Sequence, residues 1–121
     1  MNYTIQMEPK FDFLELIDTT KLIDSCTEKW FNQTLCKVND SIIRLGVFNE
    51  GEFHWHKHDN EDEFFFVIKG ILYIELENET VEILPHQCIT IPKGVRHRPY
   101  VKEPTAVIMV ESDSVQPVGD V

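Results

Sequence analysis

Short runs of β-forming residues alternate with turn-forming residues over most of this chain. Turn-forming pairs such as Asn39-Asp40 and Lys69-Gly70 stand between successive runs, where the backbone has to reverse. Many short strands at nearly even spacing are typical of an all-β sandwich or barrel. The predicted strands cover residues 33–38, 41–48, 53–57, 63–68, 71–76, 80–84, 88–91, 98–101 and 105–111.

The segment before residue 33 follows a different pattern. Apolar residues between positions 13 and 26 recur at the spacing of a helix. Asp18 or Thr19 can cap such a helix, because a short side-chain oxygen accepts hydrogen bonds from the free amides of a first turn. We therefore predict a helix that runs from this cap through Trp30.

The pattern divides the chain into parts of a single domain. We expect an N-terminal helical or strand extension over residues 1–32, a β-barrel over residues 33–112 and a C-terminal tail over residues 113–121. No Pro- or Gly-rich linker separates the extension from the barrel. The strand at 63–68 is apolar on both faces apart from Glu63, so its outer face should pack under the helix or against a second protomer. The second arrangement predicts a homodimer.

Charge and cysteine content limit the partners and the compartment. With 11 basic and 21 acidic residues the chain has a formal net charge of −10, which repels nucleic acids and anionic membrane surfaces. No apolar run approaches the roughly 20 residues that cross a bilayer, and the N-terminal sequence lacks the features of a signal peptide. Cys26, Cys36 and Cys88 are odd in number and share no C-x-x-C spacing. We therefore expect reduced, mostly buried thiols in a cytoplasmic protein.

The candidate chemistry lies in two short segments. His56 and His58 are two residues apart in a predicted strand, so both rings should leave the same face, roughly 7 Å apart along the strand. Glu63 opens the next strand, and a lone carboxylate that points into a barrel needs a cation or strong hydrogen bonds. His97 follows a Pro-x-Gly turn that can direct it toward the same place. Three imidazoles and one carboxylate form a complete ligand set for one divalent transition metal.

Each of these residues has a plainer interpretation. The histidine pair is alternatively part of a solvated loop, and Glu63 is alternatively one more surface acid beside an acidic stretch. We expect the acids of that stretch, Asp59, Glu61 and Asp62, to face solvent and to make the mouth of the site electronegative. Glu63 differs from them because it begins an apolar strand.

Four further residues are candidates for other roles. His54 shares the face of His56 by alternation, so it should point into the barrel, either as a core histidine with a hydrogen-bond partner or as a base that contacts substrate. Arg44 and Arg98 are able to bind an anionic substrate, although an ordinary surface or dimer-contact cation is the plainer interpretation of both. Cys88 has no obvious partner and is expected in the core.

These segments resemble the two motifs of the cupin superfamily. The first motif combines glycine, a His-x-His pair, glutamate and a second glycine, and the second combines Pro-x-Gly with a histidine. The matching residues are Gly51, His56, His58, Glu63 and Gly70 in the first motif, and Pro92, Gly94 and His97 in the second. The loop after Gly51 is one residue shorter than in the family, and His86 and Val101 replace the glycine and the asparagine that flank the second motif. The missing asparagine affects a hydrogen bond around the site, not a metal ligand.

The resemblance implies a small single-domain cupin, which is a double-stranded β-helix or jelly-roll barrel, here with a short N-terminal helix. It also implies that His56, His58, Glu63 and His97 bind one divalent transition metal per chain. Fe, Mn or Ni would leave open positions for oxygen, water or a substrate, whereas four-coordinate Zn would be filled unless Glu63 moves away. Similar small cupins are commonly dimers, which again implies a homodimer.

Two functions stay open on this basis. The first is a metal-dependent enzyme, of oxygenase or isomerase type, that acts on a small polar molecule. The second is a non-enzymatic cupin that binds or stores a small molecule, in which the metal is structural or orients the ligand. The ligand set favours the enzyme, because purely structural sites tend to be closed and rich in sulfur. Against the enzyme, the sequence offers no convincing general base beyond His54.

Overall fold

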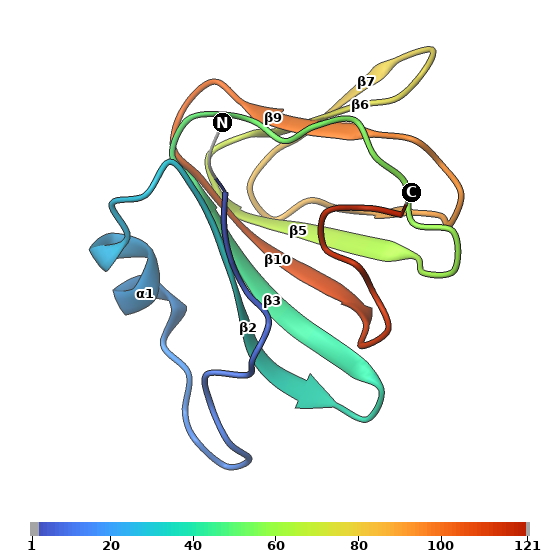
Figure 1. The fold of residues 1–121 in the computed structure, drawn as a ribbon. Helices are drawn as coiled ribbons and strands as arrows, with labels where there is room; N and C mark the ends of the chain where they lie inside the picture. Colours follow the sequence, from blue (N-terminus) through green and yellow to red (C-terminus); the bar gives the residue numbers. More distant parts are fainter. Residues whose placement is uncertain (1–2, 121) are drawn as a thin grey trace.

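The computed structural model describes residues 3–120, which form two β-sheets on either side of an apolar core (Figure 1). One sheet has the strand order β1-β2-β3-β10-β5-β8, and the other has the order β4-β9-β6-β7. The elements are β1 (Thr4–Gln6), α1 (Thr19–Ser25), β2 (Trp30–Val38), β3 (Ser41–Phe48), β4 (Gly51–Glu52), β5 (Glu63–Lys69), β6 (Leu72–Glu75), β7 (Thr80–Ile83), β8 (Cys88–Ile91), β9 (Arg98–Val101) and β10 (Thr105–Ser112).

Most neighbouring strands are antiparallel and far apart in the sequence. β10 lies between β3 and β5 in the larger sheet, and β6 lies between β7 and β9 in the smaller one. This order, with partners taken from both ends of the chain, folds the two sheets into a jelly-roll barrel. The structure therefore confirms the predicted all-β fold with one short helix.

Two apolar clusters stabilise the sheets. The first fills the space between them and includes Trp30 and Phe48, whose stacked rings have centroids 4.0 Å apart. In the second cluster, Ile23 of α1 packs with Leu45 of β3. Ile68 of β5 packs against this second cluster as well. Part of the outer face of β5 is therefore covered by the N-terminal extension.

The helix is shorter than the sequence predicts. Asp18 caps it as expected, since its Oδ1 accepts a hydrogen bond from the Thr20 amide at 3.1 Å. The helix nevertheless ends at Ser25 and does not continue through Trp30. Trp30 instead begins β2 and is buried, because its large apolar surface is stabilised more by the barrel core than by an exposed helical turn. No helix among the described residues is long and apolar enough to cross a membrane.

The residues before α1 extend the larger sheet. β1 pairs with β2 in parallel. Further along, the amides of Lys10 and Phe11 donate to the carbonyl oxygens of Thr34 and Leu35, each at 3.0 Å. The N-terminal extension is therefore attached to the barrel by backbone hydrogen bonds as well as by apolar contacts.

The cysteines are less buried than predicted. All three thiols are free, Cys26 and Cys36 are half-buried, and Cys88 is exposed. The predicted place of Cys88 in the core is therefore wrong. In the edge strand β8, Ile91 points inward, and alternation leaves Cys88 and Thr90 on the solvent side.

A β-bulge interrupts the strand that was predicted to contain the histidine pair. β4 pairs with β9 through Glu52 and Tyr100, whereas His56 forms an isolated bridge with His97. The first segment therefore advances four residues, from Glu52 to His56, while the second advances only three, from Tyr100 to His97. The first segment has to accommodate one extra residue. Pro99 contributes to the interruption because it has no backbone N–H to donate. Beyond the bulge, the alternation of inward and outward side chains is shifted by one position.

The C-terminal tail lies beside the loop that follows the bulge, at one end of the barrel (Figure 1). Val115 is buried and attaches the tail to the rest of the molecule. The Asp120 amide donates to the Lys57 carbonyl at 2.8 Å, and Asp120 Oδ2 accepts from the Asp59 amide at 2.6 Å. Residues 113–120 of the tail are therefore an ordered part of this end of the barrel.

Candidate metal centre

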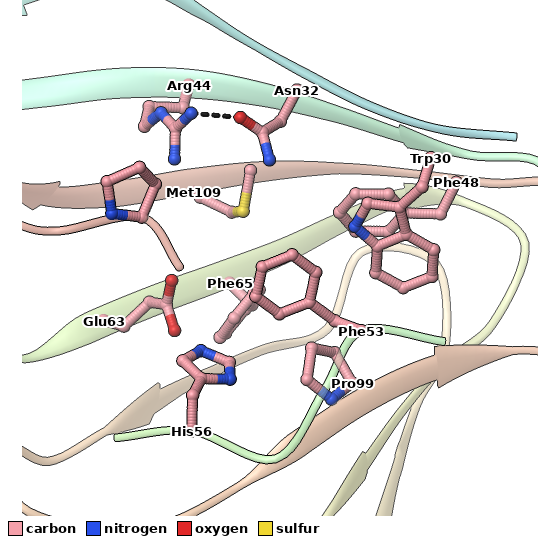
Figure 2. A pocket seen from close by; sticks show the side chains of 11 residues that line it. Trp30, Asn32, Arg44, Phe48, Phe53, His56, Glu63, Phe65, Pro99 and Met109 are labelled. Carbon is pink, nitrogen blue, oxygen red and sulfur yellow. Dashed lines mark hydrogen bonds between the residues drawn. The ribbon is translucent and has the colours of Figure 1, made fainter. Parts of the chain in front are cut away.

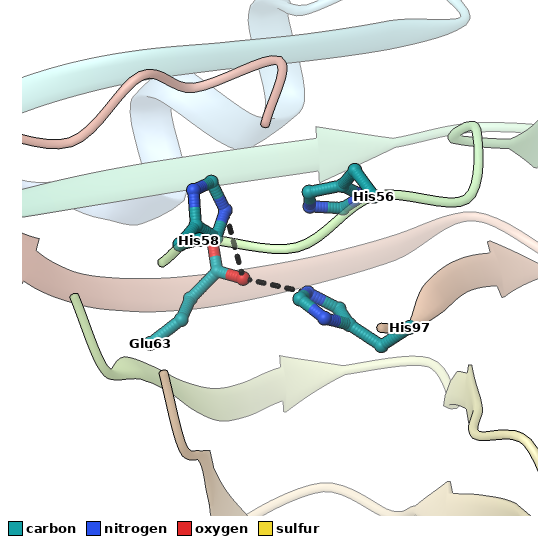
Figure 3. A group of neighbouring side chains, drawn as sticks. All are labelled: His56, His58, Glu63 and His97. Carbon is teal, nitrogen blue, oxygen red and sulfur yellow. Dashed lines mark hydrogen bonds and ion pairs between the residues drawn. The ribbon is translucent and has the colours of Figure 1, made fainter. Parts of the chain in front are cut away.

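Four side chains from three parts of the chain meet inside this end of the barrel (Figure 3). His56 and His58 come from the loop after β4, Glu63 begins β5, and His97 directly precedes β9. Each is buried, and one potential ligand atom of each lies within 4.8 Å of the others. The fold thus brings together all four residues that the sequence singled out as metal ligands.

Local backbone geometry places these residues. The hydrogen bonds between His56 and His97 are 3.1 and 2.9 Å long, which holds the two segments side by side. Gly94, in the turn before His97, has a φ of 82°, a conformation that glycine adopts without strain. Its amide donates to the His58 carbonyl at 2.7 Å. The Pro-x-Gly turn therefore connects the second motif directly to the first.

Backbone carbonyls orient two of the imidazoles. Nδ1 of His56 lies 2.9 Å from the His54 carbonyl oxygen, and Nδ1 of His97 lies 3.0 Å from the Val95 carbonyl oxygen. A carbonyl oxygen can only accept, so each Nδ1 carries the proton and each Nε2 presents a lone pair. Metal-binding histidines commonly have this arrangement, in which the N–H away from the metal is held by an oxygen.

The remaining contacts within the cluster place ring nitrogens of histidines next to the carboxylate of Glu63, so hydrogen-bond acceptors face one another. Nε2 of His97 lies 3.0 Å from Oε1 of Glu63, and Nε2 of His58 lies 3.8 Å from the same oxygen. Both ring nitrogens of His58 are buried without a hydrogen-bond partner among residues 3–120. Buried polar atoms without partners are costly, and a divalent cation would bind one ring nitrogen of His58 together with the carboxylate. The residues present therefore fit the metal that the motifs imply.

Burial favours the neutral form of the imidazoles. It lowers the pKa of His56 to about 3, with a further contribution from the neighbouring His97. Burial likewise lowers the pKa of His58 and of His97, and it raises the pKa of Glu63. Neutral imidazole is the form that binds a metal, so no proton has to leave the histidines when an ion enters at neutral pH.

Next to this cluster lies a buried ion pair that the sequence analysis missed. Arg44 is 2% exposed and Glu111 is 3% exposed, with 3.8 Å between Nη1 and Oε2. The expected surface position of Arg44 is therefore wrong. Arg44 has the same strand parity as Phe48 in β3, which is the signal that places it inside. Burial, together with the neighbouring Glu63, raises the pKa of Glu111 well above its ordinary value.

Glu61 is a second correction. Asp59 and Asp62 are exposed as expected, but Glu61 is buried. Its Oε2 accepts a hydrogen bond from the hydroxyl of Ser114 at 2.8 Å. The partner comes from the C-terminal tail, which is why the acidic stretch alone gives no sign of this burial.

His54 does not point into the barrel with His56. Phe53 keeps the register of β4, since its amide donates to the Pro99 carbonyl at 2.9 Å, and the extra residue lies between Phe53 and His56. Phe53 is therefore buried and His54 is exposed. The ring of His54 stacks on Phe53 with centroids 4.3 Å apart, and its Nε2 lies 2.5 Å from the Val118 carbonyl oxygen. The predicted inward orientation is wrong, and the role of His54 as a base stays a prediction.

Arg98 lies outside the centre. It is half-buried and forms ion pairs with Glu75 and Glu52 of the smaller sheet. This environment fits an ordinary cation on the outside of the barrel rather than a ligand-binding group of the metal centre.

A small cavity of about 20 Å³ adjoins the four residues (Figure 2). This volume is close to the space that one water molecule requires. The polar part of its wall consists of His56, Glu63, Arg44 and Asn32. The apolar part includes Trp30, Phe48, Phe53 and Phe65, together with Pro117 of the tail. One wall of the cavity therefore consists of proposed metal ligands, another consists of hydrogen-bond donors, and aromatic side chains form much of the rest.

Comparison with known proteins assigns this fold and site to a family. The family described as "Cupin domain" matches residues 47–112, a segment that contains the whole four-residue cluster. The chain therefore belongs to the cupin domain family.

Individual relatives agree with this assignment. The "Uncharacterized protein YdbB" of Bacillus subtilis (strain 168) is 37% identical over 92 residues, which cover 75% of this chain and 80% of that protein. The crystal structure of a cupin-2 domain containing protein from Shewanella frigidimarina NCIMB 400 matches with a TM-score of 0.75 and 30% identity, over 80% of this chain and 94% of that one. KdgF from Halomonas sp. matches with a TM-score of 0.65 and 22% identity, over 74% and 85% of the two chains, which shows a shared fold. A shared fold does not by itself assign a reaction.

Proposed function

We propose that this cupin binds one divalent transition metal (Fe, Mn, Ni or Zn) through His56, His58, Glu63 and His97 and is an enzyme that acts on a small polar molecule there. Oxygenase- or isomerase-type chemistry is the leading reaction class. The observation that carries the proposal is the buried cluster itself, in which three imidazoles and a carboxylate converge. The two nitrogens of His58, which have no partner among the described residues, add to this support.

The residues around the metal have distinct roles. His56 and His97 present Nε2 lone pairs while backbone carbonyls hold their Nδ1 protons. Glu63 supplies a negative charge that offsets part of the charge of the ion. A divalent metal held by these residues would supply Lewis-acid chemistry toward an oxygen atom of the bound molecule. Aromatic side chains form much of the cavity wall, and such an apolar surrounding strengthens electrostatic interactions inside the cavity.

Elemental analysis of untagged protein, purified without chelator, tests the metal centre. We expect close to one metal ion per chain. Iron would favour oxygen chemistry, whereas zinc, nickel or manganese would support the site without selecting a reaction, because expression hosts load whichever metal is available and binds most tightly. Protein that holds no metal even after reconstitution would contradict the proposal.

Removal of one proposed ligand should weaken metal binding without unfolding the barrel. In His97→Ala we expect metal affinity to fall by more than the roughly 10- to 100-fold that follows the loss of a group that merely supports a ligand. The apolar core between the sheets stays intact, so the far-UV circular dichroism should not change. Competition with a chelator measures the affinity, and His86→Asn, at an exposed turn position, is the control. Full metal occupancy in His97→Ala would remove His97 from the ligand set.

A non-enzymatic binding or storage protein is the second candidate. The cavity of about 20 Å³ favours it, because such a cavity leaves little room beside the metal. Azide distinguishes the two candidates when it is added to the metal-loaded protein. A change in the spectrum of the metal shows an open coordination position and supports the enzyme. An unchanged spectrum supports a saturated metal with a structural or ligand-orienting role.

We also propose that the chain forms a homodimer. Phe13, Leu14 and Leu16 in the loop before α1 are 86%, 105% and 95% exposed, which is unusual for adjacent large apolar side chains. Light scattering should give the mass of two 14.2 kDa chains, and Phe13→Ser/Leu16→Ser should lower it. The mass of a single unmodified chain would contradict the dimer. The cytoplasmic location and the small-molecule partner stay predictions.

A further inference from the structure

One end of the cavity beside the metal centre is lined by hydrogen-bond donors. Arg44 and Asn32 form this end, and His56 and Glu63 lie across the cavity from them (Figure 2). Arg44 and Asn32 are 2% and 6% exposed. Buried polar side chains need partners, so the N–H groups that the protein leaves unused indicate which kind of ligand enters.

Protein acceptors use only some of these donors. Nε of Arg44 donates to Thr34 Oγ1 at 3.2 Å, and Nη2 donates to Asn32 Oδ1. Nη1 lies 3.8 Å from Glu111, which is too far for a hydrogen bond. Because the oxygen of Asn32 accepts from Arg44, its Nδ2 group has two N–H bonds to donate, and no hydrogen bond within residues 3–120 uses them.

We propose that Arg44 and Asn32 recognise an anionic oxygen of the substrate and that the ligand of this centre is a small carboxylate. One oxygen of such a carboxylate would face the metal, and the other would accept hydrogen bonds at the Arg44–Asn32 end. A guanidinium matches the geometry of a carboxylate better than any other side chain. This inference rests on the proposed metal centre and deepens it by naming the substrate class.

The size of the cavity limits which part of the ligand enters. A volume of about 20 Å³ is close to the space of one water molecule, so it has room for one oxygen of a carboxylate but not for the rest of the ligand. Pro117 of the tail forms part of the same wall.

A simpler role for Arg44 is charge compensation for Glu111 and Glu63. Compensation requires a positive charge at this place but no free N–H group. The two roles therefore make different predictions when Glu111 is neutralised together with Arg44. Under compensation alone, the paired change leaves anion binding intact, whereas under recognition the loss of arginine weakens it.

The test measures acetate and acetamide binding to protein loaded with Co²⁺, whose visible spectrum changes when a ligand binds. The two probes have nearly the same shape and differ by one charge. We expect acetate to bind more tightly than acetamide in the unmodified protein. In Arg44→Met/Glu111→Gln, acetate affinity should fall about 10- to 100-fold, the effect of losing a hydrogen bond to a charged group. Glu111→Gln alone is the matched control and should keep its acetate affinity.

The outcomes separate this inference from the metal site. Unchanged acetate affinity in the double variant, with an unchanged cobalt content, overturns the role of Arg44 and leaves the centre intact. Failure of the unmodified protein to bind cobalt contradicts the proposed function and this inference together. Asn32→Leu is the second variant if the double variant does not fold, and equal acetate affinity in it also overturns the inference. Arg98→Met, on the outside of the barrel, controls for the change in net charge.

Discussion

A glycine near the C-terminus limits where a proposed metal ligand can lie. Gly119 has a φ of 97°, and a Cβ added there would lie 2.5 Å from the Cβ of His56. That distance is shorter than atoms in van der Waals contact allow. Any side chain at position 119 therefore strains the backbone and also pushes on His56.

Gly119→Ala should weaken metal binding although position 119 is not a ligand. We expect a lower metal affinity by chelator competition, together with a loss of roughly 1–3 kcal/mol in the free energy of unfolding from backbone strain. Gly70→Ala is the matched control, because its φ is 78° but the added Cβ would meet Thr105 and no residue of the metal centre. If both variants lower the metal affinity equally, the contact with His56 is not the cause.

The residues of the site differ in how far the sequence predicts them. His56, His58 and His97 were identified because short spacings and a Pro-x-Gly turn are local features of the chain. Arg44 and Glu111 were not, because the burial of a charge depends on partners that only the folded barrel supplies. The alternation of side chains along the strand places Arg44 on the inner face, but its charge favoured the interpretation as a surface residue.

At the scale of elements, strands are predicted better than the irregularities between them. β3, β8 and β9 begin and end at the predicted residues, because turn chemistry is encoded locally. The bulge after β4 was missed, because it depends on how that segment pairs with β9, far along the chain. The same miss caused the wrong orientation of His54. The end of α1 was missed because Trp30 is held by tertiary packing rather than by helix propensity.

The C-terminal tail should slow the escape of the metal. Deletion of residues 113–121 removes Pro117 from the cavity wall and Gly119 from its contact with His56. It also removes the buried side chain of Val115, which contributes about 1.5–3 kcal/mol to stability. We expect the truncated protein to unfold at lower urea concentration and to lose metal to a chelator faster than the full chain.

Val115→Ala in the full chain separates these two effects. It removes most of the same apolar burial but keeps Pro117, Gly119 and the hydrogen bonds of Asp120. The substituted chain should therefore lose stability while it releases metal at nearly the original rate. If it releases metal as fast as the truncated protein, then covering by the tail is not what retains the ion.

The whole molecule should be destabilised by acid when it is free of metal. Burial lowers the pKa of His56 from 6.5 to about 3, so between these values the unfolded chain binds a proton that the folded chain does not. The free energy of unfolding therefore falls as the pH falls, by up to about 1.4 kcal/mol per pH unit for this histidine. The lowered pKa values of His58 and His97 act in the same direction.

Two buried carboxyl groups oppose part of this effect. The pKa values of Glu63 and Glu111 are raised above 4.5, so above that pH the folded chain holds protons that the unfolded chain has lost. We expect the urea midpoint to fall from pH 6.5 to 4.5 and more steeply below 4.5. His56→Gln should reduce the slope. The same slope with and without His56 would show that this histidine does not titrate as its burial requires.

Because the tail lies over the metal centre, proteolysis of the tail can report whether the centre holds a metal ion. Residues 113–120 include Asp113 and Asp120 but no lysine or arginine, so an aspartate-specific protease can cut there where trypsin cannot. Cleavage requires the tail to lift away from His54 and Lys57. An ion that immobilises His56 keeps the tail closed for more of the time. The cleavage rate, followed by mass spectrometry, therefore reports metal occupancy even for an ion without colour, such as zinc.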